Sequence, residues 1–131
     1  MPITVNWDDS EQNVLHFVYM GQWTWDDYQR VTLQARELAK IATGQIDVIA
    51  NFSQSSPLPN NALSYFRKSY TTAQSTIGFN IAVLVFRDSF LTRMIEVFQR
   101  LYASGGGKIT TTSSVEAARQ IIRDRRLAKN Q

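Results

Sequence analysis

Several residue types are absent or scarce in this sequence, and each absence excludes a class of site. The 131 residues include no cysteine, which excludes disulfide bonds, thiolate metal ligands and a cysteine nucleophile. The single histidine, His16, excludes a metal site built from several imidazoles. The longest uninterrupted apolar run, Ile81 to Phe86, is far shorter than the roughly 20 residues that cross a bilayer. We therefore expect no metal, no cofactor and no transmembrane segment.

The charge of the chain is modest and nearly balanced. Fourteen Lys and Arg residues against eleven Asp and Glu give a formal net charge of +3, which is small for a domain that binds nucleic acid. Residues are 44% hydrophobic and 19% charged, which suits the core of one ordinary domain. The segment Met1 to Asp9 has neither the basic start nor the apolar stretch of a signal peptide. We expect a cytoplasmic protein that does not bind nucleic acid.

Short runs of β-branched and aromatic residues predict the strands. A polar segment separates the first two runs, which indicates an antiparallel hairpin. The fourth run is apolar throughout, so we expect it beside the third run in the centre of a partly parallel sheet, with both faces covered. The last run is typical of an edge strand. The predicted strands are Ile3–Trp7, Val14–Met20, Ile46–Phe52, Ile81–Phe86 and Lys108–Thr112.

The first predicted helix follows the hairpin. The Thr24 hydroxyl can cap it, and Asp26 and Asp27 suit the positive end of the helix dipole. Gly44 is the predicted stop. Three-four spacing predicts one buried stripe, which consists of Tyr28, Val31, Ala35, Leu38 and Ala42.

Three more helices are predicted further along the chain. One begins near Asn60 and another after Asp88, and the last opens with a capping-box pattern at Ser113–Glu116. Residues 124–131 are predicted to form a basic tail. Strands that alternate with helices require helices on the faces of the sheet. The fold class is therefore α/β, a sandwich formed by a single domain over residues 1–131.

The residues form no catalytic constellation. His16 lies in mid-strand without an acid partner that the sequence identifies. The run Gly105–Gly107 precedes Lys108, but its spacing differs from a phosphate-binding loop and it leads into a strand rather than a helix. Asp26 and Asp27 are adjacent, so their side chains diverge on a helix. We expect no catalytic residues and no enzymatic activity.

Two groups of side chains leave alternatives open. The arginines of the last helix either mark a surface for an acidic partner or form a solvated face near the helix C-terminus; these are Arg119, Arg123, Arg125 and Arg126. The tryptophans near the hairpin either line a groove or, as is more frequent, pack in the core; these are Trp7, Trp23 and Trp25.

Five stretches of the sequence match a known pattern. Gly21-Gln22-Trp23-Thr24 followed by Trp25-Asp26-Asp27-Tyr28 resembles the "G-x-h-T-x-x-D-Y" passage of SpoIIAA-like proteins of the STAS (sulfate transporter and anti-sigma-factor antagonist) superfamily. Asn51-Phe52-Ser53 is similar to the Asp-hydrophobic-Ser that ends their third strand. Ala82–Phe86 with Arg93–Phe98 resembles a later strand and helix, and Ser114–Ala118 resembles the final junction. The resemblance spans nearly the whole chain.

This resemblance implies a SpoIIAA-like sandwich with a mixed sheet of about five strands and about four helices. It also implies regulation through an unidentified protein partner. In anti-sigma-factor antagonists, a partner kinase phosphorylates a serine at the start of the helix after the third strand. Leu58-Pro59-Asn60-Asn61 occupies that start here, so we expect the usual phosphoserine switch to be absent. The candidate interaction loop consists of Ser53, Ser55, Ser56, Asn60 and Asn61.

The resemblance also gives an alternative function. SpoIIAA-like proteins are similar in topology to lipid-carrying Sec14-like domains, so a small apolar ligand could bind in a pocket between the sheet and the third helix. The stripe that would line it consists of Leu91, Met94, Ile95, Phe98 and Leu101. Because a small domain needs such residues for its own core, partner binding ranks first.

The third predicted helix carries more apolar surface than one contact with a sheet requires, and we predict that the excess forms a homodimer. The candidate dimer or ligand surface consists of Phe90, Met94, Val97, Phe98 and Leu101. Sedimentation at micromolar concentration should show a dimer that Val97→Asp dissociates. A species of 15.0 kDa that Val97→Asp leaves unchanged would contradict the prediction.

Overall fold

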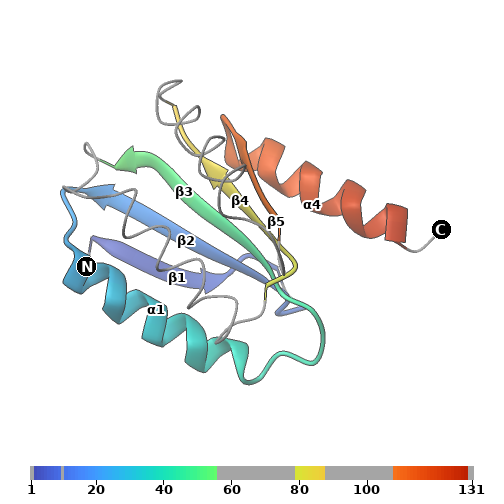
Figure 1. Ribbon diagram of the computed structural model, residues 1–131, viewed down its shortest axis with the longest axis horizontal. Helices are drawn as coiled ribbons and strands as arrows, with labels where there is room; N and C mark the ends of the chain where they lie inside the picture. The colour runs from blue at the N-terminus through green and yellow to red at the C-terminus, as the bar shows by residue number, and fades with distance from the viewer. Residues whose placement is uncertain (1, 10, 56–78, 88–107, 130–131) are drawn as a thin grey trace.

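Five strands lie side by side in the order in which they occur along the chain (Figure 1). The protein is described by a computed structural model over residues 2–9, 11–55, 79–87 and 108–129. Its strands are β1 (Ile3–Trp7), β2 (Val14–Gly21), β3 (Asp47–Ser55), β4 (Ile81–Val85) and β5 (Lys108–Thr112). β1 pairs antiparallel with β2, whereas β2 to β5 pair parallel. The predicted hairpin and mixed sheet are confirmed.

The central strands are apolar on both faces. Ile81, Val83 and Val85 of β4 are buried in a core cluster on one face, and Ala82 is buried in a second cluster on the other face. β4 lies between β3 and β5, so its predicted central position is confirmed. A strand of this kind requires cover on both sides of the sheet.

Two helices provide that cover from opposite sides (Figure 1). α1 (Trp25–Ala39) buries Val31 and Ala35 in the cluster that includes Ala82. α4 (Val115–Lys129) buries Ala118 in the cluster of Ile81, Val83 and Val85. The sheet is therefore the middle layer of an α/β sandwich.

The first helix begins as predicted but ends earlier. The Thr24 hydroxyl accepts a hydrogen bond from the Asp27 backbone N–H at 3.2 Å, and the Asp27 carboxylate accepts from the Thr24 backbone N–H at 3.0 Å. These two contacts form a capping box. α1 ends at Ala39, with Lys40 as its C-cap, so the prediction of a stop at Gly44 is wrong. A turn at 40–41 separates the helix from that glycine.

The start of α4 also differs in detail from the prediction. The Ser114 hydroxyl accepts from the Ala117 backbone N–H at 3.1 Å, so Ser114 rather than Ser113 is the cap. The third helical position is then Ala117 and not Glu116. An alanine methyl group cannot accept a hydrogen bond from the backbone N–H of the cap residue, so the predicted capping box does not form. The helix continues to Lys129, so residues 124–129 form its last turns rather than a separate tail.

The third strand is longer than predicted. Pairing continues past Phe52, with Met20 opposite Gln54 and Gly21 opposite Ser55, after a register shift in β2. Ser53 and Ser55 therefore lie in β3 and not in a loop. Their polarity gave the wrong boundary, because the last residues of a strand can be hydroxyl side chains when pairing with the neighbouring strand continues.

The described residues contain two helices, whereas about four were predicted. The helices predicted to begin near Asn60 and after Asp88 lie outside the described residues. Within the described part of the chain, neither helix combines the length and apolar character that a membrane crossing demands.

The fully buried side chains should dominate stability. Ile49 of β3 is 0% exposed and Leu33 of α1 is 59% exposed. We expect Ile49→Ala to lower the free energy of unfolding by about 2–5 kcal/mol, because it leaves a cavity. Leu33→Ala should change it by less than about 0.5 kcal/mol. Urea unfolding measures both, and similar losses for the two variants would contradict this packing.

Candidate functional site

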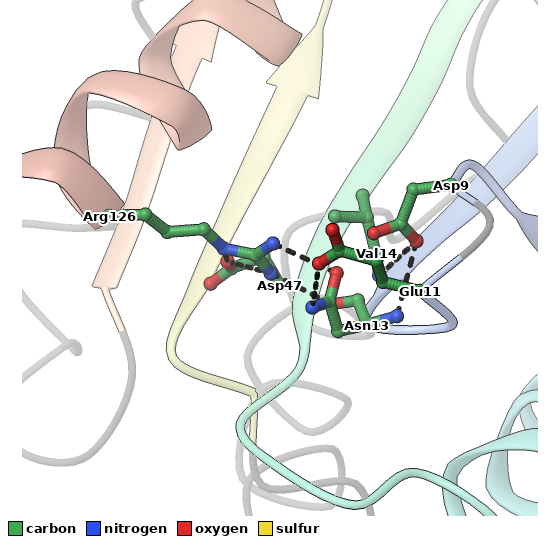
Figure 2. Close-up of polar contacts among 6 residues, drawn as sticks. All are labelled: Asp9, Glu11, Asn13, Val14, Asp47 and Arg126. Carbon is green, nitrogen blue, oxygen red and sulfur yellow. Dashed lines mark hydrogen bonds and ion pairs between the residues drawn. The ribbon is translucent and has the colours of Figure 1, made fainter.

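A tight polar turn joins β1 to β2. The Asp9 carboxylate accepts hydrogen bonds from the backbone N–H groups of Asn13 and Val14, each at 3.1 Å (Figure 2). Gln12 adopts a φ of 57°, in the left-handed region that favours glycine. The carboxylate of Asp9 therefore fixes a turn whose local backbone preference alone is unfavourable.

Arg126 of α4 connects this turn to the start of β3 (Figure 2). Its Nε donates to Asp47 Oδ2 at 2.8 Å, and its Nη1 and Nη2 donate to the side-chain and backbone oxygens of Asn13 at 2.8 and 3.1 Å. The side chain of Asp47 is 4% exposed, and its Oδ1 is buried without a hydrogen-bond partner. We call these contacts of Arg126 with Asp47 and Asn13 the Arg126 tether.

A second arginine of α4 contacts the same turn. Arg119 donates from Nε to Asp8 Oδ2 at 2.9 Å and from Nη2 to Asp8 Oδ1 at 2.8 Å. His16 Nδ1 lies 3.4 Å from the same Oδ1. The hydrogen bond from Arg119 holds the pKa of Asp8 below its usual range, while burial lowers the pKa of His16. We call the Asp8, His16 and Arg119 contacts the Arg119 tether.

The sequence did not identify an acid partner for His16, and the structure supplies Asp8. The register of the hairpin places Asn6 opposite His16. Asp8 follows Asn6 by two residues, so it lies near His16 on the same side of the sheet. The contact between Asp8 and His16 could therefore have been predicted from the register of the hairpin. The distant partner, Arg119, is separated from Asp8 by 111 positions, and local spacing gives no indication of it.

The four arginines of α4 do not act as one group. Arg119 and Arg126 are in ion pairs with Asp8 and Asp47, and Arg123 donates to Gln120 at 2.8 Å. Arg125 Nε is buried without a hydrogen-bond partner. The interpretation as a solvated face thus fails for the two tether arginines, which attach α4 to the sheet.

Aromatic side chains gather at the opposite, carboxyl end of β2 and β3. The Trp23 indole N–H donates to the Ser55 hydroxyl at 2.8 Å, and Trp23 is 2% exposed. The Tyr19 ring stacks on Phe52, with ring centroids 4.1 Å apart, and Trp25 meets Trp23 edge-on at 5.1 Å. Trp23 is therefore a core residue, as the more frequent alternative predicted.

The third tryptophan lies elsewhere. Trp7 pairs with Leu15 near the start of β2, whereas Trp23 follows the end of that strand. The three tryptophans do not line one groove.

The serines of the candidate interaction loop are held by neighbouring side chains. Ser53 donates from its hydroxyl to Asn51 Oδ1 at 2.6 Å and from its backbone N–H to the same atom at 3.0 Å. Ser55 accepts from Trp23. The remaining loop positions, Ser56, Asn60 and Asn61, lie outside the described residues, as do all five residues of the predicted dimer or ligand surface, Phe90, Met94, Val97, Phe98 and Leu101.

In the described part of the chain, no three Asp, Glu or His side chains gather around a common point.

Comparison with solved structures shows which fold this chain has. No family model and no curated protein matches the sequence. The structure is similar to the crystal structure of an uncharacterized protein of the DUF3478 family from Shewanella loihica PV-4, described as having a SpoIIAA-like fold. The TM-score is 0.65 at 18% sequence identity, over 90% of this chain and 91% of the other. The chain therefore has a SpoIIAA-like fold, as the resemblance implied.

Removing one side of the Arg126 tether should destabilise the protein. We expect Arg126→Met to lower the free energy of unfolding by about 2–3 kcal/mol, because it leaves the buried Asp47 carboxylate without its cation. Adding Asp47→Asn should recover part of this loss, since the amide carries no charge. Arg123→Met, on the exposed side of α4, should change stability by less than about 0.5 kcal/mol. Equal losses for Arg126→Met and Arg123→Met in urea unfolding would contradict a stabilising tether.

Proposed function

We propose that this protein is a non-catalytic regulatory module that acts by binding another protein, in the manner of anti-sigma-factor antagonists. The SpoIIAA-like fold and the sequence resemblance support this class of function. The observation that carries the proposal is that the single histidine is engaged within the fold. The only imidazole contacts a carboxylate that Arg119 already occupies.

The binding surface that we propose lies at the carboxyl ends of the parallel strands. Binding crevices in α/β sheets form at this edge, because successive loops leave the sheet there. Three exposed side chains mark it: Gln22 after β2, Gln54 near the end of β3 and Arg87 after β4. We call these three residues the carboxyl rim. Beneath it, Trp23 and Phe52 form a rigid aromatic floor, which suits a surface that does not rearrange on binding.

We propose further that the usual phosphoserine switch is absent. The Ser53 and Ser55 hydroxyls both take part in hydrogen bonds within the fold. A phosphate on Ser55 would break the hydrogen bond to the buried Trp23 indole. Its main effect would be to lower the stability of the fold and not to switch a binding surface on or off. The predicted helix start carries Asn60 and Asn61, neither of which can accept a phosphoryl group as serine does.

A matched pair of glutamines tests the binding surface. A photo-crosslinking amino acid at Gln54 should capture one defined protein from a lysate of cells that express the chain. The same probe at Gln34, which is exposed on α1, should capture none. With the captured protein purified, Gln54→Arg should weaken its affinity at least about tenfold, and Gln34→Arg should leave it unchanged.

Three results would count against the proposal. Equal capture from Gln54 and Gln34 would show that the carboxyl rim is not the binding interface. Phosphate on Ser53 or Ser55 in protein purified from those cells would restore the switch. Turnover of a substrate by the purified chain, lost in His16→Gln, would make the protein an enzyme.

A further inference from the structure

The Arg119 tether joins three charged or titratable groups through one carboxylate. Asp8 Oδ1 accepts from Arg119 Nη2 at 2.8 Å and also lies 3.4 Å from His16 Nδ1. The hydrogen bond between Arg119 Nε and Asp8 Oδ2 completes a bidentate pair. α4 and the imidazole of β2 therefore share the same anion.

The other side of the imidazole has no acceptor for a second proton. His16 Nε2 is buried without a hydrogen-bond partner. Its neighbours across the sheet are Asn6 and Ile49, which carry no charge. The charged groups near the ring are Asp8 from the turn and Arg119 from α4, and Glu116 of α4 acts on Arg119. A proton on the ring would add a second cation beside Arg119 and an unpaired buried N–H.

We propose that a proton on His16 loosens the attachment of α4 to the sheet. When α4 moves away, Arg119 leaves Asp8, and that carboxylate becomes available to the imidazolium alone. The imidazole thus binds a proton more tightly with α4 detached than with α4 attached. Because linkage is reciprocal, binding of the proton must favour detachment.

The electrostatics of the site agree with this direction. Burial lowers the pKa of His16 below its usual 6.5, repulsion from Arg119 lowers it further, and Asp8 only partly offsets these effects. A lowered pKa in the folded protein means that attachment is complete above pH 6.5 and weakens as the pH falls through the lowered value. Asp8, with its pKa below 3.8, stays ionised through this window. Each unit by which detachment raises the pKa of His16 weakens attachment up to about tenfold.

α4 is suited to such control because, among the described residues, ion pairs accompany a small set of apolar contacts that hold it to the sheet. Its buried side chains are Ala118 and Ile122, with Val115 and Ile121 partly buried. Alanine buries little apolar surface, so among the described contacts the two tethers add to an apolar attachment that depends mainly on Ile122. The Arg126 tether does not contact His16, and we therefore expect the effect to concentrate in the first half of the helix.

Hydrogen exchange on the intact chain measures the attachment directly. Between pH 7.5 and 5.5, after correction for intrinsic rates, protection of the backbone amides from Ala118 to Ile122 should fall about three- to tenfold. Amides of α1 should keep their protection, which provides an internal control. In His16→Gln, which cannot take up a proton, the same α4 amides should show no change between the two pH values.

A second measurement does not depend on that variant folding. The chain has one histidine, so a single imidazole signal in NMR reports the pKa of His16. Arg119→Met should raise that pKa, because it removes a neighbouring cation and frees Asp8. An unchanged pKa in Arg119→Met, equal α4 protection at both pH values, or an equal loss in His16→Gln would each overturn the proposal.

Discussion

The burial of β3 and β4 on both faces is the constraint on which the rest of the structure depends. Val83 and Ile49 are both 0% exposed, and neither face of their strands can be left to water. One face receives α1 and the other receives α4. Within the described residues, α4 buries Ala118 and Ile122 on its face, and the ion pairs of Arg119 and Arg126 also hold it there.

The strands and the layer order could be predicted because they follow from local pattern. Uninterrupted apolar residues placed β4 in the centre, and the polar segment between the first two runs indicated the hairpin of β1 and β2. Boundaries were less accurate where polar residues continue a strand, as Ser53 and Ser55 do. Pairing with the neighbouring strand decides such positions, and a single sequence does not display that pairing.

The tethers could not be predicted, because their partners are far apart in the chain. Asp47 and Arg126 are 79 positions apart, and Asn13 and Arg126 are 113 apart. Aspartate and arginine are common surface residues, so nothing in their local sequence marks them as pairs. The core position of Trp23 could be predicted, because tryptophan packs in the core more often than it lines a groove. Its hydrogen bond to Ser55 could not, because the sequence placed Ser55 in a loop and not in β3.

The left-handed residue Gln12 has a consequence for the order of folding. An L-residue in this conformation costs about 1–2 kcal/mol, so the β1–β2 turn depends on contacts that offset this cost, both from Asp9 within the turn and from the arginines of α4. Its arginine contacts come from a helix near the end of the chain. During synthesis, the hairpin leaves the ribosome long before those arginines exist. The hairpin is therefore translated well before its arginine contacts can form, and this end of the sheet gains them only after α4 has been synthesised.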